Sequence, residues 1–177
     1  MSTHKSIPNS AIDRTTAIGT ARFAHEFLSA AMREHANAHD SVDADISSTP
    51  ALYLMGHGIE LTLKAFLLGH GMTSRELRKM GQNGHDLMEA LSAAISCGLE
   101  CQLSEEQGEL AALKVLNGNY AVKEFEYITI GTTIWPRFGV LATAACKLFN
   151  AVAPSVGYSR TLSVRLPVES KETHESI

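Results

Sequence analysis

The sequence predicts an all-α protein: an antiparallel bundle of about five helices with an extended arm at its C-terminal end. Its 177 residues include 22 Ala and only 5 Pro, respectively the best and the worst helix-forming residues. Apolar residues recur at helical spacing, and Gly, Asn or Pro separates one such stretch from the next. With 45% hydrophobic residues, the chain is large enough to bury one substantial core.

The first predicted helix begins at Thr15 or Thr16, whose hydroxyl can cap it, and continues to about His39. Its apolar stripe consists of Ile18, Ala21, Ala24, Phe27, Leu28, Ala31 and Met32. The polar, acidic stretch 40–49 that follows is typical of a loop.

The second predicted helix, 50–69, begins at Pro50 and is apolar on nearly all of its faces. Such a helix is buried on both sides, so it lies at the centre of the fold or is shared with a second subunit. We therefore expect a homodimer formed through this helix. Its polar residues, His57, Glu60 and Lys64, share one face.

Residues 73–83 form a polar, basic connection that has room for one short helical turn. The third predicted helix covers 86–97, with Asp86 at its start, where a carboxylate is favoured. Its apolar stripe consists of Leu87, Leu91, Ala94 and Ile95.

The fourth predicted helix, 105–116, follows the capping box formed by Ser104 and Gln107 and ends at Asn117-Gly118. The β-branched run 128–134 can form a short strand, and residues 123–127 can be its partner strand or a loop. The fifth helix begins at Pro136 and continues to about Val152, and Pro154 ends it. The alternating stretch 161–166 resembles a strand, which would lie across a partner or across its own bundle.

These elements divide the chain into an expected disordered leader (1–12), a helical bundle (13–153) and a C-terminal arm and tail (154–177). The first ten residues have no apolar segment of the signal-peptide kind. The charge-free apolar stretches are shorter than a membrane span requires. We therefore expect a cytoplasmic protein with no membrane partner.

The charge balance excludes two broad classes of protein. A net charge of −4 with only 19% charged residues argues against disorder of the whole chain and against a nucleic-acid binder that uses its whole surface. The three Cys, an odd number, are typical of reduced thiols. The 8 His are dispersed, and their spacings do not complete a metal-binding set, so we expect no metal and no cofactor.

Residues 51–91 resemble the HEPN domain superfamily in the order Ile-Glu-x-x-Leu-Lys-Ala, Leu, Gly, a connector and Gly-His-Asp-Leu. The matching residues are Ile59, Glu60, Leu63, Lys64, Ala65, Leu67, Gly71, Gly84, His85, Asp86, Leu87 and Leu91. The resemblance implies a dimeric helical bundle of prokaryotic origin. Many HEPN proteins are metal-independent RNases of toxin–antitoxin and phage-defence systems, and others bind nucleotides or act as non-catalytic scaffolds.

The nuclease motif of that superfamily, Arg-x4-6-His in a late helix, is not found at that place in this chain. Arg137 has no His after it within reach, and the one match, Arg33 with His39, lies in the first predicted helix. Whether the chain is an enzyme therefore stays open at the level of sequence.

Each candidate site residue has a functional and a structural interpretation. His85 and Asp86 could supply acid–base catalysis or could cap a helix. Glu60 and Lys64 could line a ligand pocket or form an intrahelical ion pair. Phosphate could bind to the three basic residues of the connector, which could equally be a solvated face. These are Arg75, Arg78 and Lys79.

We expect a non-catalytic binding or regulatory module for a nucleotide, an RNA or an antitoxin-type partner protein, in prokaryotic defence or a toxin–antitoxin system. The alternative is a divergent metal-independent RNase. The two differ in whether an Arg and a His converge in one cleft.

Overall fold

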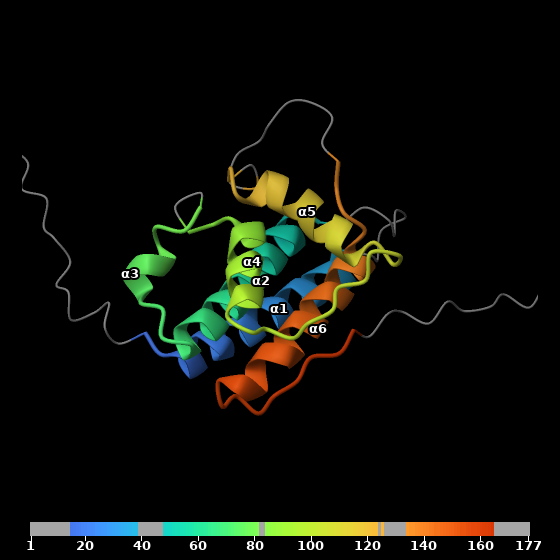
Figure 1. The fold of residues 1–177 in the computed structure, drawn as a ribbon. Helices are drawn as coiled ribbons and strands as arrows, with labels where there is room; N and C mark the ends of the chain where they lie inside the picture. Colours follow the sequence, from blue (N-terminus) through green and yellow to red (C-terminus); the bar gives the residue numbers. More distant parts are fainter. Residues whose placement is uncertain (1–14, 39–47, 82–83, 124, 126–133, 165–177) are drawn as a thin grey trace, which may run out of the picture.

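The computed structural model describes residues 15–38, 48–81, 84–123, 125 and 134–164 (Figure 1). Within these residues the chain forms six helices and no strand, which confirms the predicted all-α fold. The one helix beyond the five expected is a single turn within the basic connector 73–83, where the sequence permits a short helical turn.

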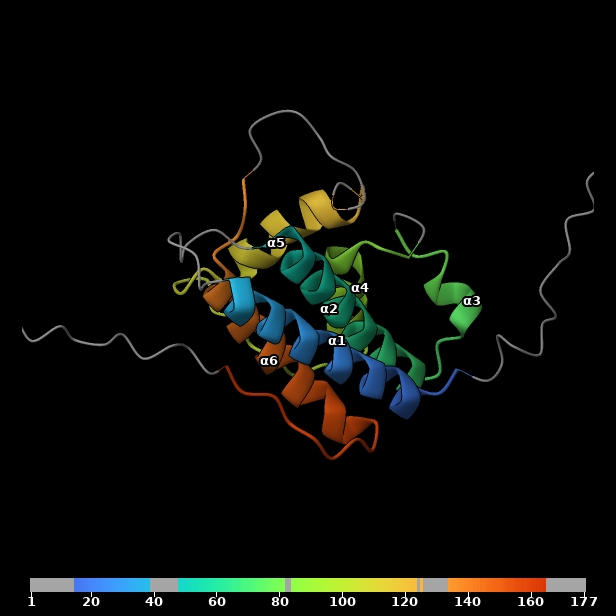
Figure 2. The same ribbon diagram turned by 180° about the vertical axis from the view of Figure 1, so that it is seen from behind.

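Three long helices lie side by side: α1 (Ala17–Ala38), α2 (Thr49–Gly69) and α6 (Phe138–Ser155) (Figures 1 and 2). The Thr16 hydroxyl accepts the Gly19 amide at the start of α1, which confirms the predicted cap. Small residues let α1 and α2 approach closely. A Cβ at Gly58 would lie 2.6 Å from the Leu28 side chain.

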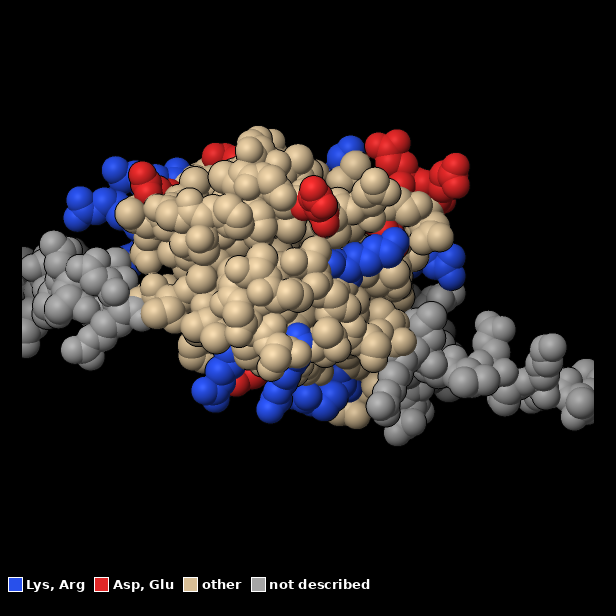
Figure 3. All heavy atoms as spheres, turned by 60° about the horizontal axis from the view of Figure 1, so that its bottom comes forward, with Lys and Arg blue, Asp and Glu red and all other residues tan. Residues whose placement is uncertain are grey.

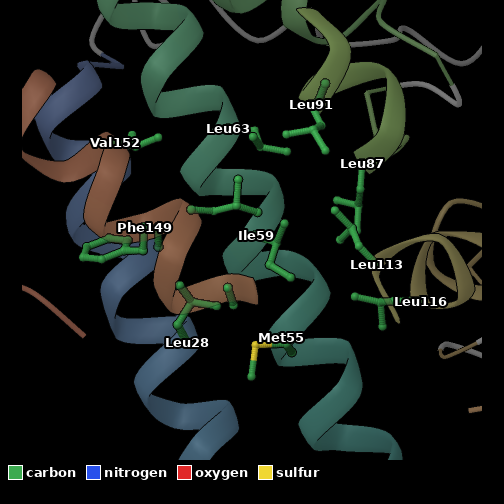
Figure 4. Close-up of a cluster of buried hydrophobic side chains, with 14 of the residues drawn as sticks. Leu28, Met55, Ile59, Leu63, Leu87, Leu91, Leu113, Leu116, Phe149 and Val152 are labelled. Carbon is green, nitrogen blue, oxygen red and sulfur yellow. The ribbon is translucent and has the colours of Figure 1, made fainter. Parts of the chain in front are cut away.

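Two shorter helices, α4 (Leu87–Ser96) and α5 (Glu109–Tyr120), pack against α2 from a different side (Figures 1 and 4). Figure 4 shows Ile59 and Leu63 of α2 between side chains of α1 and α6 on one side and side chains of α4 and α5 on the other. The one-turn helix α3 (Ser74–Leu77) lies to the side of the bundle.

Helix α2 is therefore central, as its apolar faces predicted. Its neighbours α1, α4, α5 and α6 belong to the same chain, and their packing explains its apolar character without a second subunit. The homodimer through 50–69 stays a prediction, because the structure contains one chain.

Two helices, α2 and α6, are long and apolar enough to cross a membrane by length and composition, with a mean hydropathy of 1.2 each. Most of each stretch is buried inside the bundle, 67% for α2 and 56% for α6. Core helices meet the same criteria, so this observation is weak evidence for a membrane span.

Two predicted core positions are wrong, since Ile18 is 48% exposed and Ile95 is 53% exposed. At ~100° per residue, each lies about 90–100° from the centre of the buried stripe of its helix. An apolar residue so far around the helix reaches only the edge of the core.

The predicted boundaries of α5 and α6 need correction. Helix α5 begins four residues later than expected, after Gly108 in a left-handed conformation (φ 72°). It also continues past Asn117-Gly118 to Tyr120. Helix α6 includes Pro154 in its last turn, although Pro has no amide to donate to the preceding turn. The helix ends in a Schellman motif at Gly157 (φ 79°), in which the carbonyls of Ala153 and Pro154 accept the amides of Tyr158 and Gly157.

The C-terminal arm lies on its own bundle, which decides between the two alternatives for the described part of the arm. Its described residues, 156–164, run back along α6 without forming a strand (Figures 1 and 2). Of the run 128–134 only Ile134 is described, so the predicted strand lies almost entirely outside the described residues.

Candidate functional site

A buried carboxylate, Glu60 of α2, is the focus of a polar cluster in the bundle. Glu60 is 2% exposed. Its Oε1 accepts a hydrogen bond from the Lys64 ammonium. Its Oε2 accepts from the Tyr120 hydroxyl at 2.6 Å and from His85 Nδ1 at 2.9 Å. We call Glu60, Lys64, His85, Tyr120 and the neighbouring His57 the Glu60 centre.

Three separate segments supply the Glu60 centre. The spacing i, i+3, i+4 puts His57, Glu60 and Lys64 on one face of α2, as predicted. Tyr120 comes from the last turn of α5 and packs closely against α2, where a Cβ at Gly56 would be 2.5 Å from its ring. His85 comes from the segment between α3 and α4.

The hydrogen-bond pattern of the centre assigns its protons. A carboxylate only accepts, so Tyr120 and His85 Nδ1 both donate to Glu60. The Tyr120 oxygen is then an acceptor for His57 Nδ1, 3.1 Å away. Both imidazoles therefore carry their proton on Nδ1 when neutral, and Nε2 is the ring nitrogen left available in each.

The electrostatics of the centre favour an ionised Glu60 beside a neutral His57. Burial by itself would raise the pKa of Glu60, but the charge of Lys64 and hydrogen bonds from Lys64, Tyr120 and His85 hold it below the ordinary value of 4.5. Burial lowers the pKa of His57 below 6.5, against the attraction of Glu60. Glu60 thus carries the negative charge of the cluster.

A small pocket of about 50 Å³ adjoins the Glu60 centre. Its walls are aromatic and imidazole rings together with one lysine side chain. The lining residues are Tyr53, His57, His85, Tyr120, Lys123 and Phe125. Tyr120 was missed by the sequence reasoning because the predicted fourth helix ended at 116, short of this residue.

Asp86 serves the start of α4 rather than the pocket. Its Oδ1 accepts the amides of Met88 and Glu89, each at 3.0 Å, which is an N-cap. Asn117 of α5 donates to the same oxygen at 3.2 Å and accepts the Leu87 amide at 2.7 Å. The His85-Asp86 pair is thus divided between two hydrogen-bonded clusters.

A second and much larger cavity, of about 850 Å³, lies where the end of α2, the start of α1 and α3 meet. We call it the basic cavity, because all three predicted phosphate-binding residues line it. Its lining residues are Thr15, Thr16, Ala17, Leu68, Gly71, Met72, Thr73, Ser74, Arg75, Arg78 and Lys79. Figure 3 shows several Lys and Arg side chains at the α3 edge of the molecule, with an acidic side chain beside them, and few charged side chains in the middle of this face.

The cations of the basic cavity differ from Lys64 of the Glu60 centre in their relation to acidic groups. Lys79 lies close enough to the Glu76 carboxylate of α3 to interact with it electrostatically, but that carboxylate is hydrogen-bonded to Thr73. Arg75, Arg78 and Lys79 are exposed, and none forms an ion pair with a carboxylate of the described residues. Their positive charges are therefore not neutralised by a direct ion pair within the described residues.

The structure does not bring the remaining candidates into either site. Arg33 is exposed on α1 and lines neither pocket, and His39 lies outside the described residues. Among the described side chains there is no group of three or more His, Cys, Asp or Glu that could hold a metal ion. The three Cys are free thiols.

Comparison of the chain with known protein families, with curated proteins and with solved structures finds no match. The HEPN resemblance therefore rests on the sequence motif and the helical architecture alone. The chemistry of the two sites has to carry the functional argument.

Proposed function

We propose that this protein is a HEPN-like binding module whose basic cavity takes the phosphate groups of a nucleotide or an RNA. The single observation that carries the proposal is the set of three cationic side chains around one cavity, none of which forms a direct ion pair with a carboxylate of the described residues. Two of the three are arginines, whose guanidinium groups bind phosphate through paired hydrogen bonds.

The rest of the lining suits such a ligand. The Ser74 hydroxyl adds a polar group beside the cations, whereas the Thr73 hydroxyl is held by Glu76 in the capping box of α3. Leu68 and Met72 offer an apolar wall for a base. A volume of about 850 Å³ is in the range of small-molecule sites. One cavity could thus hold the charged and the apolar part of one ligand.

The Glu60 centre fits a supporting role in this proposal. Its carboxylate already accepts from three side chains, so a ligand would have to displace an existing partner to reach it. His85 ties the segment that follows Arg78 and Lys79 to α2. We propose that the module is non-catalytic and acts through binding. Its proposed setting is prokaryotic defence or a toxin–antitoxin system, with an antitoxin-type protein as a further partner.

Binding measurements test the proposal with ATP and with a fluorescent single-stranded RNA as probes. We expect the double variant Arg75→Ala/Arg78→Ala to bind at least about tenfold more weakly, since it loses two charge-assisted contacts. Lys114→Ala, which removes an exposed cation of α5, is the matched control and should bind like the wild type. Equal affinities of the double variant and the wild type would reject the basic cavity as the site.

A metal-independent RNase is the second candidate, favoured by one specific observation. His57 and His85 both line the small pocket with Nδ1 engaged and Nε2 available, and Lys123 lines it too. Two imidazoles can serve as base and acid, while an ammonium stabilises phosphate charge. Cleavage of total RNA in EDTA that is lost in both His57→Gln and His85→Gln would support this candidate, and intact RNA would reject it.

A further inference from the structure

The C-terminal arm is held on the bundle by a small number of well-defined contacts. The side-chain amide of Asn150 on α6 donates to the Leu162 carbonyl and accepts the Leu162 amide, each at 2.8 Å. Tyr158, Leu162 and Val164 pack against the core. The arm starts at Gly157, whose left-handed backbone (φ 79°) turns the chain back along α6.

One titratable residue, His25 of α1, lies at the junction of the arm and the bundle. Its ring is 5.7 Å from the ring of Phe149 on α6 and 5.8 Å from the ring of Tyr158 on the arm. Phe149 and Tyr158 also meet edge to face, with centroids 6.0 Å apart. The three rings join α1, α6 and the arm at one point.

The surroundings of His25 favour its neutral form. Burial lowers the pKa of His25 below 6.5, and Arg160 of the arm lowers it further, against the opposing charge of Glu26 on α1. From α6, the contact to His25 is the uncharged ring of Phe149. Neither ring nitrogen of His25 has a hydrogen-bond partner among the described residues. A charge placed on His25 would thus be poorly compensated while the arm is docked.

We propose that His25 is a proton-sensitive latch for the C-terminal arm: its protonation loosens residues 156–164 and uncovers the apolar surface of α1 and α6 that they cover. The positive charge of protonated His25 would lie beside the rings of Phe149 and Tyr158 and near the guanidinium of Arg160, which belongs to the arm. Detachment of the arm removes Tyr158 and Arg160 together, so it relieves the lost hydration and the repulsion at once.

The direction of the pH dependence follows from the lowered pKa of docked His25. The docked arm prefers neutral His25, so docking is fully favoured above pH 6.5. As the pH falls below 6.5, His25 binds a proton more readily in the detached state than in the docked state, so docking weakens. Below the lowered pKa of docked His25 both states are protonated, and docking weakens no further. A single coupled proton changes the docking equilibrium by at most about tenfold per pH unit.

Limited proteolysis of the whole protein tests this latch at pH 7.5 and pH 5.5. The measured quantity is the cleavage rate by thermolysin within 156–164, divided by the rate for the same sequence as a free peptide, which cancels the response of the protease to pH. For the wild type we expect the ratio to rise several-fold at the lower pH. His25→Gln should remove most of that rise, whereas His70→Gln, a substitution at the residue that follows α2, should keep it.

Two further variants keep the latch testable if the His25→Gln variant does not fold. Arg160→Gln, at an exposed position, should lower the cleavage ratio at pH 5.5 because the repulsion is gone. Asn150→Ala should raise the ratio at both pH values, which shows that cleavage reports on arm docking. A ratio in the wild type that does not change with pH, or the same change in His25→Gln, would overturn the latch.

Discussion

The Glu60 centre and the basic cavity are neighbours on α2, since Lys64 belongs to the first and Leu68, one turn later, to the second. In the Glu60 centre, charged and polar groups bind one another, because a buried carboxylate without partners would be strongly unfavourable. In the basic cavity the cations remain hydrated and need no internal partner. The comparison teaches that the buried polar cluster uses its hydrogen-bonding groups on one another, whereas the exposed cations do not, and for this reason we propose the basic cavity as the binding site.

The largest expected effect comes from removing Glu60. Glu60→Ala leaves Lys64, His85 and Tyr120 without their common acceptor, so we expect a loss of about 3–5 kcal/mol in the free energy of unfolding. Urea denaturation followed by circular dichroism measures this loss. Glu106→Ala removes an exposed carboxylate and should change stability by less than about 0.5 kcal/mol. Similar midpoints for the two variants would contradict a structural role of the Glu60 centre.

An intermediate effect is expected from Gly56→Ala, which tests how Tyr120 reaches Glu60. The added methyl group would lie 2.5 Å from the Tyr120 ring and would push that ring off α2, at a cost of about 1–3 kcal/mol. Gly118→Ala is a matched control, because it is also helical and its Cβ meets nothing within 4 Å. The control should gain about 0.5–1 kcal/mol from helix propensity. Denaturation midpoints that shift in the same direction for both variants would contradict this packing.

The smallest effect on stability is expected in the basic cavity. Arg78→Ala removes an exposed side chain without an ion-pair partner among the described residues, so the free energy of unfolding should change by less than about 0.5 kcal/mol. Its affinity for ATP or RNA, measured by titration, should fall nonetheless. A large loss of stability would place Arg78 in the structural part of the molecule and remove the contrast between the two regions.

The sequence predicted features that depend on neighbouring residues of the chain. The pairing of Glu60 with Lys64 follows from the spacing i, i+4, and the cap at Asp86 follows from a carboxylate placed before an apolar helical run. The central place of α2 followed from its apolar faces. Each of these features is encoded within a few turns of one helix, so periodicity and capping rules are enough to find it.

Only the tertiary structure decided which helices meet, and with them the partners of the buried charges. Tyr120 reaches Glu60 from a residue 60 positions later, and Lys147 of α6 lies 2.6 Å from the buried carboxylate of Glu109 on α5. No local spacing indicates either contact. The three cations of the connector can be identified from the sequence, but the cavity that they line exists because the start of α1, the end of α2 and the helix α3 lie near one another. Helical periodicity specifies which face of a helix is buried, whereas the partner of that face is selected by packing over the whole chain.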